Sequence, residues 1–238
     1  MIWIVPFFYG DKNKNERYDI KMKYYIIGGC IALFIVLLIV ALIFVKKQKN
    51  KKIGKDGEKK VSSALKRYAG IRSYKVINDL YLPLYDKTTQ IDHILIGFFG
   101  ILVVETKNLS GEIYGDPRKK EWLHIIGSKK HQLYNPLMQN QAHIDCIRHI
   151  LGQEKIYNLN IESLVVFSAK KVDLYIPKKL PIVTFSKLKK YLRQPRFEKD
   201  NNVDVDQIYN ALMKNQVTDK KLIADHNKNV KIMAKNNK

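Results

Sequence analysis

Asp92, Glu105 and Lys107 are the residues of this 238-residue chain whose types and spacing could do chemistry together. Two β-like runs, 90–96 and 101–106, are joined by a Gly-Phe-Phe-Gly segment, which predicts a hairpin with a four-residue loop. The register that this loop sets puts Asp92 opposite Glu105. The two-residue period of a strand puts Lys107 on the same face as Glu105. The pattern therefore predicts two carboxylates and one ammonium on one face of a sheet.

A divalent cation is the natural partner of such a cluster. Like charges that face each other across neighbouring strands destabilise a sheet, so Asp92 and Glu105 need an offset. Mg²⁺ is typically held by one or two carboxylates together with waters and substrate phosphate. The cation polarises a phosphoryl oxygen and supplies hydroxide, while the ammonium of Lys107 orients the water or offsets developing charge. This chemistry is phosphodiester hydrolysis; the alternative is that Glu105 and Lys107 simply end a strand and pair with surface groups.

The remaining pattern indicates which elements position these residues. An amphipathic helix is expected at 57–69, with Glu58 at the edge of its apolar stripe. A later helix begins at Asn135-Pro136, a capping residue followed by proline, and places Gln139 and His143 one turn apart. Further strands are expected at 74–77, 80–84, 112–114, 121–126, 163–168 and 182–185, and further helices at 186–193 and 205–213. Strands interleaved with helices predict an α/β layered domain.

Several short motifs occur in a characteristic order. They are Gly57-Glu58, Gln90-Ile91-Asp92-His93, Val104-Glu105-Thr106-Lys107-Asn108, Gly111, Trp122, and Asn135-Pro136 with Gln139 and His143. Over about residues 54–150 this set resembles the nuclease-related domain (NERD) family. Such domains are taken to be similar to PD-(D/E)-x-K restriction endonucleases. The resemblance implies a restriction-endonuclease-like mixed sheet flanked by helices, and metal-dependent cleavage of nucleic acid, DNA before RNA.

The resemblance also implies roles by position. Asp92 and Glu105 would bind Mg²⁺ or Mn²⁺, and Lys107 would assist the attacking water. Glu58 would approach the metal from the first helix, and Gln139 would be the contribution of the later helix. Lys107, Glu58 and Gln139 are thus the candidate catalytic residues.

Two positions leave alternatives open. His143 could contact phosphate, donate to Glu58 as a second layer of the site, or be a packed core histidine. Ile91 stands where the wider nuclease motif has proline. The competing class of function is a non-catalytic, membrane-tethered module that binds nucleic acid or protein, and a lipid-facing adaptor is a third. The six histidines are dispersed and lack metalloprotease spacing, which excludes a typical zinc hydrolase.

A membrane anchor is predicted ahead of the domain. Residues 24–45 contain no charge over 22 positions, or about 33 Å of helix against about 30 Å of bilayer hydrocarbon. Five basic residues precede this stretch and eight follow it within fifteen positions, which favours a cytoplasmic C-terminal part. Residues 1–23 form a short basic segment, and Met22 is an alternative start. Residues 46–53 are expected to be a lysine-rich linker.

Composition agrees with one domain plus appendages. The net charge of +21 indicates a nucleic acid or an anionic membrane as neighbour, although drift in an AT-rich genome also enriches lysine. Two cysteines, more than a hundred residues apart, exclude a disulfide framework and indicate a reducing compartment. The nuclease-like domain is expected at 54–215, followed by a polar tail, 216–238, that is a frayed helix or disordered.

Overall fold

The computed structural model describes residues 12–84 and 87–236, and the chain divides into two compact units, Met1–Lys52 and Ile53–Lys238. Helix α1, Lys12–Gly70, runs through the end of the first unit into the second. The lysine-rich stretch 46–53, expected to be a linker, is therefore helical, because lysine favours helix and nothing there breaks one. Residues 1–11 of the predicted N-terminal segment lie outside the described residues.

Among the described residues, one helical stretch is long and apolar enough to cross a membrane. It covers Ile31–Gly70, and its most apolar window has a mean hydropathy of 2.4 and no buried residue. Length and composition of this kind are shared by membrane spans, signal sequences and core helices of soluble proteins. The predicted membrane helix at 24–45 is therefore helical and overlaps this apolar stretch, which agrees with a span by length and composition alone.

The second unit contains two mixed sheets within the described residues. The larger has the order β1-β2-β3-β7-β9, with β3, β7 and β9 parallel and the first three strands antiparallel. Its strands are β1 Lys75–Leu84, β2 Lys87–Gly97, β3 Gly100–Lys107, β7 Ile161–Phe167 and β9 Ile182–Thr184. The smaller has the order β6-β5-β4-β8, with strands β4 Gly111–Tyr114, β5 Glu121–Ile126, β6 Lys129–Tyr134 and β8 Val172–Tyr175.

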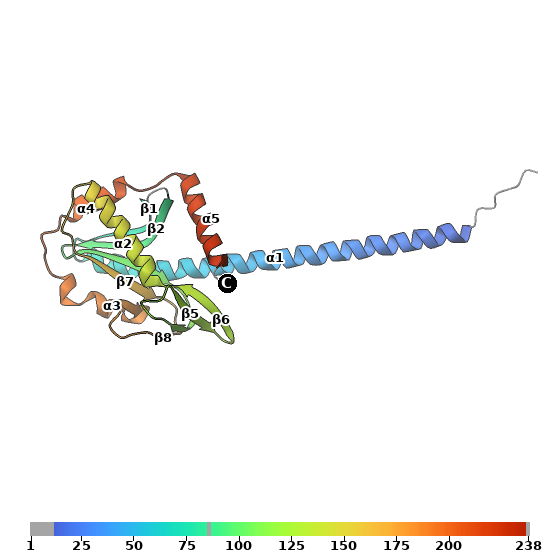
Figure 1. Cartoon of the computed structure of the whole chain (residues 1–238), viewed down its shortest axis with the longest axis horizontal. Coiled ribbons are helices and arrows are strands. Elements are labelled where there is room, and N and C mark those ends of the chain that lie inside the picture. The colour runs from blue at the N-terminus through green and yellow to red at the C-terminus, as the bar shows by residue number, and fades with distance from the viewer. Residues whose placement is uncertain (1–11, 85–86, 237–238) are drawn as a thin grey trace, which may run out of the picture. The chain divides into compact units, whose positions relative to one another are not determined.

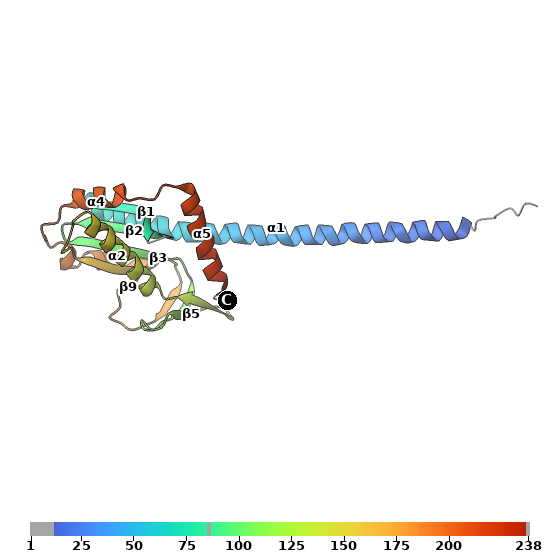
Figure 2. The same cartoon turned by 45° about the horizontal axis from the view of Figure 1, so that its top comes forward.

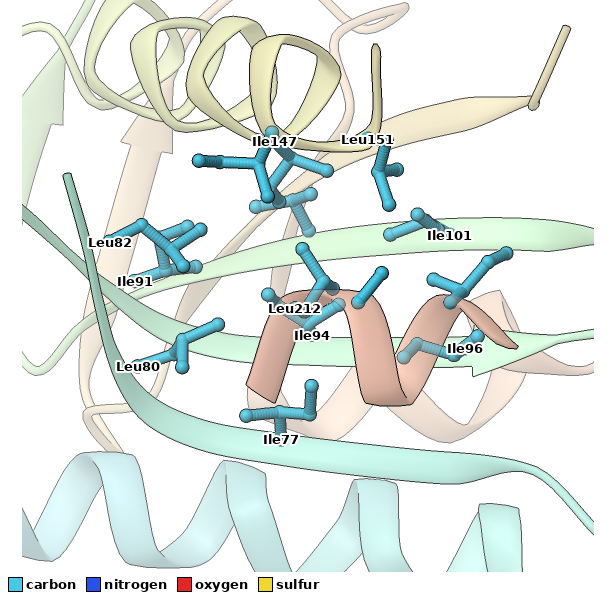
Figure 3. Close-up of a cluster of buried hydrophobic side chains, with 14 of the residues drawn as sticks. Ile77, Leu80, Leu82, Ile91, Ile94, Ile96, Ile101, Ile147, Leu151 and Leu212 are labelled. Atoms are coloured by element: carbon cyan, nitrogen blue, oxygen red, sulfur yellow. The ribbon is translucent and has the colours of Figure 1, made fainter. Parts of the chain in front are cut away.

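Helices cover both faces of the larger sheet. Helices α2, Pro136–Gln153, and α4, Val205–Lys214, lie over one face, as Figures 1 and 2 both show. In Figure 3, Ile147 and Leu151 of α2 and Leu212 of α4 pack with the isoleucines of β2 and β3. The last turns of α1 and helix α3, Phe185–Leu192, pack on the opposite face. The α/β prediction is confirmed at this level.

The chain after α4 is not a free tail. A 3₁₀ turn at Pro195–Phe197 precedes α4, and helix α5, Lys220–Asn236, follows α4. His226 Nδ1 contacts the Thr88 carbonyl oxygen at 2.7 Å, and the His226 ring meets Tyr81 edge to face. Of the two alternatives for this segment, helix is therefore correct over 220–236.

The predicted hairpin forms with the expected register. Ile96 pairs with Ile101, but Gly97 also pairs with Gly100, so the loop has two residues rather than four. Gly100 has a φ of +123°, and a side chain there would meet the Asn160 carbonyl oxygen, which explains why glycine closes this loop. The shorter loop does not change which residues of β2 and β3 face each other. Glu105 and Lys107 share one face of β3, as predicted.

Candidate active site

Asp92 lies where β2 and β3 separate. The ladder between these strands ends at the pair His93 and Val104, one step before Asp92 would face Glu105. The Asp92 carboxylate replaces the ladder there: its Oδ2 accepts a hydrogen bond of 2.9 Å from the backbone N–H of Thr106. The expected cross-strand pair of Asp92 with Glu105 does not form. The side chain of Asp92 takes the place of the backbone hydrogen bond and still lies beside β3.

Glu105, Lys107 and Gln139 form a connected cluster. Lys107 Nζ donates to Glu105 Oε1 and to Gln139 Oε1, both at 2.7 Å. The Glu105 side chain is 3% exposed and that of Lys107 is 18% exposed, so most of this contact is shielded from water. Asn135 caps α2 by accepting from the Leu137 N–H, and this fixes the start of the helix that carries Gln139.

His143 lies on the other oxygen of Glu105. Its Nε2 is 3.4 Å from Glu105 Oε2, and its Nδ1 is 2.8 Å from Thr89 Oγ1. A carboxylate beside Nε2 favours the proton on that nitrogen, which leaves Nδ1 to accept from the Thr89 hydroxyl. The contact between His143 Nε2 and Glu105 Oε2 is too long for a good hydrogen bond, so both atoms are buried without one. His143 therefore lies against Glu105 and Thr89, which disagrees with the alternative in which it donates to Glu58.

The electrostatics of Glu105 reflect these neighbours. Burial raises the pKa of its carboxyl, but the Lys107 ammonium and the His143 ring more than offset burial and bring the pKa to about 2. Burial alone would lower the pKa of Lys107, but the Glu105 carboxylate more than offsets burial, so the pKa of Lys107 is raised. Glu105 is a carboxylate and Lys107 an ammonium at neutral pH.

Asp92 and Glu58 are carboxylates without a comparable partner. Burial first, and then the Glu105 charge, raise the pKa of Asp92 well above its ordinary value. Burial and then the nearby Asp79 raise the pKa of Glu58. Glu58, Asp79 and Asp92 line one groove of about 440 Å³, together with three lysines of α1: Lys55, Lys59 and Lys66. The groove brings negative groups from α1, β1 and β2 next to the Glu105 cluster.

The donor set fits one kind of metal site. Glu105 Oε2 is buried without a hydrogen bond, and Asp92 has an oxygen beyond the one that accepts from Thr106. Within residues 12–84 and 87–236, no three Asp, Glu, His or Cys side chains are grouped to hold a metal by themselves. The geometry therefore suits a hard cation held by two carboxylates and completed by water, rather than an all-protein cage.

His93, next to Asp92, lines the same groove but is held by hydrogen-bond partners of its own. Its ring contacts Asn78 Oδ1 at 2.8 Å and Thr106 Oγ1 at 3.2 Å, and burial lowers its pKa to about 4. A neutral, hydrogen-bonded imidazole at this place supports the β1–β2–β3 junction.

Sequence reasoning missed three polar residues of this region. Thr89 orients His143, Asp79 lines the groove, and Asn140 ties α2 to the sheet by donating to the Val103 carbonyl oxygen and Ser163 Oγ. Asn140 is fully buried, and it lies one residue after Gln139. A buried amide is detectable in the sequence only as a polar residue on the apolar face of a predicted helix, and Thr89 and Asp79 carry no such signal.

The candidate site residues lie within a stretch of the chain that matches a known family. The model of the nuclease-related domain family (NERD) matches residues 53–168, which contain Glu58, Asp92, Glu105, Lys107 and α2. An uncharacterized protein of Bacillus anthracis is 32% identical over 204 residues, which are 82% of this chain and 94% of that protein. No solved structure matches. The chain belongs to the nuclease-related domain family.

Proposed function

We propose that this protein is a membrane-anchored, divalent-metal-dependent nuclease that hydrolyses phosphodiester bonds of nucleic acid, DNA before RNA. The observation that carries the proposal is the contact of Lys107 with both Glu105 and Gln139, beside the carboxylate of Asp92. Two carboxylates with an ammonium beside them are the groups that metal-assisted phosphodiester hydrolysis uses. Membership of the nuclease-related domain family supports the same chemistry.

Asp92 and Glu105 are the residues that would hold Mg²⁺ or Mn²⁺. When bound, such a cation polarises the phosphoryl oxygen and makes water a better nucleophile. Lys107 supplies a positive charge at the place where negative charge grows during attack, and its ammonium can orient the attacking water. Because Nζ already binds Glu105 Oε1, its position relative to the carboxylate is set before substrate arrives.

Three further residues position this group. Gln139 holds Lys107 from α2 through its Oε1. His143 contacts the second oxygen of Glu105, so that oxygen faces a polar group rather than the apolar core. Glu58 enters from α1 on the side of Asp92 and adds negative charge to the groove. Their substitution should lower the rate without unfolding the domain.

The activity is tested with the full chain in detergent micelles, using labelled DNA and RNA with Mg²⁺, Mn²⁺ or EDTA. The wild-type protein should cut with either metal and stop in EDTA. Asp92→Asn should remove cleavage, whereas Asp145→Asn, on the exposed face of α2, should leave it unchanged. Wild-type protein that cuts neither substrate with Mn²⁺ would leave a non-catalytic binding module as the function.

Lys107 is tested by separating rate from affinity. Lys107→Met should lower turnover about 100-fold with less than about threefold change in the dissociation constant for DNA, because its charge matters most in the transition state. Lys129→Met, in the exposed strand β6, is the matched control for loss of one lysine. An equal loss of binding and rate at Lys107 would make it a phosphate clamp.

Membrane attachment belongs to the same proposal, with the bilayer crossed by residues 24–45 and the C-terminal domain in the cytoplasm. The uncharged stretch and the excess of lysines that follow it support this orientation. Protease added to intact cells should leave the C-terminal domain whole, and permeabilised cells are the control. Digestion from outside would reverse the orientation, and recovery in the soluble fraction would remove the anchor.

A further inference from the structure

Strand β2 has an open side just before the candidate site. Its ladder with β3 ends before Asp92, so residues 88–91 pair with β1 alone among the described strands. The segment 88–92 carries Asp92, which would hold the metal, and Thr89, whose hydroxyl contacts His143 Nδ1 at 2.8 Å. The positions of both side chains therefore depend on what holds a segment that lacks a strand on one side.

A side-chain hydrogen bond holds each end of this segment. At one end, the Asp92 carboxylate accepts from the Thr106 N–H at 2.9 Å. At the other end, Thr88 lies opposite Pro83 of β1, and proline has no N–H to donate. His226 of α5 donates to the Thr88 carbonyl oxygen through Nδ1 at 2.7 Å. A strand carbonyl without a ladder donor needs one from elsewhere, and His226 supplies it.

Helix α5 is fixed to the neighbouring strand at the same level. Tyr81 of β1 pairs with Gln90, which belongs to the open segment. The rings of Tyr81 and His226 meet edge to face, with centroids 5.6 Å apart. The Tyr81 carbonyl oxygen also accepts from the Val217 N–H at 2.8 Å, just before α5 begins. The C-terminal part of the chain therefore contacts both β1 and β2 where β3 no longer pairs with β2.

Tyr81 also shows that this contact lies close to the candidate site. Burial raises the pKa of its hydroxyl, and a hydrogen bond with Asn227 of α5 lowers it. The carboxylates of Asp79, Glu58 and Asp92 raise the pKa further, as charges do only when they are near. The same three carboxylates line the groove, so α5 borders it through Tyr81.

We infer that His226 is a positioning residue of the candidate active site: its hydrogen bond to Thr88 keeps the open segment of β2 in place, and with it Asp92 and Thr89. The inference rests on the proposed function for the metal that Asp92 would hold. Helix α5 lies beyond residues 53–168, so this support comes from a part of the chain outside the family match.

Hydrogen–deuterium exchange of the full chain in detergent micelles with EDTA reports the position of the segment without metal or substrate. In His226→Ala, the Thr106 amide, which bonds to Asp92, should exchange about fivefold faster, because one restraining hydrogen bond is lost. Peptides from β5 should exchange at the wild-type rate. Leu222→Ala, in the same helix with a side chain that is 45% exposed, is the matched control and should leave Thr106 unchanged.

Two further substitutions separate positioning from packing. His226→Asn keeps an N–H donor near the place of Nδ1 and loses the ring, whereas His226→Phe keeps an edge contact with Tyr81 and loses the donor. The Thr106 amide should exchange as in wild type in His226→Asn and as in His226→Ala in His226→Phe. The opposite ranking would overturn the inference, and so would unchanged Thr106 exchange, or faster exchange of the whole domain, in His226→Ala.

Metal binding connects the segment to the site. In calorimetry, His226→Ala should weaken Mn²⁺ binding about tenfold, as the loss of groups that orient metal ligands typically does, and His226→Asn should restore most of the affinity. Leu222→Ala should bind Mn²⁺ like wild type. Equal affinity in wild type and His226→Ala would make His226 a structural contact only and refute the positioning role.

Cleavage separates this inference from the proposed function. If wild type neither binds Mn²⁺ nor cuts DNA, and Thr106 exchange responds to His226 as expected, the nuclease proposal fails and the support of β2 by His226 stands. If wild type cuts DNA, and His226→Ala matches it in Thr106 exchange and Mn²⁺ binding, the inference fails and the nuclease stands.

Discussion

Replacing Lys107 by methionine should expose how strongly the Glu105 carboxylate depends on its partner. Glu105 is 3% exposed and its pKa is about 2, against an ordinary value of 4.5. At about 1.4 kcal/mol per pH unit, that difference corresponds to about 3 kcal/mol of stability at neutral pH. Methionine has a similar length and no charge, so it removes most of this stabilisation and leaves a buried carboxylate unpaired.

The way in which the free energy of unfolding changes with pH should identify Glu105 as the group responsible. A depressed pKa contributes stability that is present above pH 4.5 and lost as the pH falls toward about 2. In Lys107→Met, burial without the ammonium should raise the pKa of Glu105 instead. The variant should then gain stability as the pH falls from 7 toward 5, while the contribution of Glu105 in wild type is constant over that range.

The assay is urea unfolding of the full chain in micelles with EDTA, followed by the fluorescence of Trp122, which is buried, in a Trp3→Phe background. Lys107→Met should lose about 3 kcal/mol at pH 7. The double variant Glu105→Gln, Lys107→Met should recover most of that loss, because no unpaired buried charge remains. Single effects that add within about 0.5 kcal/mol would refute the reasoning, since they would mean that the two side chains do not interact.

Three other substitutions give sharp expectations. Asp92→Asn should abolish Mg²⁺ and Mn²⁺ binding in calorimetry. Without metal it should be slightly more stable than wild type at pH 7, because burial and Glu105 raise the pKa of Asp92. Unchanged metal binding would place the site elsewhere. In a Cys30→Ser background, Cys146 should resist alkylation at pH 8 until urea unfolds the domain, because burial raises its pKa to about 11; rapid labelling of folded protein would contradict this. Gly57→Ala should be destabilised by about 1–3 kcal/mol in urea, because its Cβ would overlap Ser168 Oγ, and Gly54→Ala, with open space around it, is the control.

The hairpin and the helix at Asn135 could be predicted because their signals are local. The alternation of β2 and β3 and the glycines between them define a register within about ten residues, and Ile96 does pair with Ile101. Asn135 followed by Pro136 is a capping signal that needs no distant partner. The position of Glu105 and Lys107 on one face follows from strand geometry alone.

Other parts depend on contacts that no local pattern encodes. Strand β6 is exposed along nearly its whole length and reads as a polar loop, and β8 is only four residues long. The role of Thr89 exists because His143 lies beside it, 54 residues later in the chain. The family match was foreseeable from the order of the motifs, but the bond from the Thr106 N–H to the Asp92 carboxylate was not, because it exists only where the ladder between β2 and β3 ends.

The order of strands around Glu105 has a consequence for translation. Glu105 pairs with Val165 of β7, and Lys107 contacts Gln139 of α2, so its partners are made later than the carboxylate itself. A ribosome adding roughly 5–20 residues per second needs several seconds to pass from Glu105 to Val165. During that interval the nascent chain has its apolar helix and its hairpin but no assembled cluster. The cluster of Glu105, Lys107 and Gln139 therefore assembles only after the C-terminal half of the domain has left the ribosome.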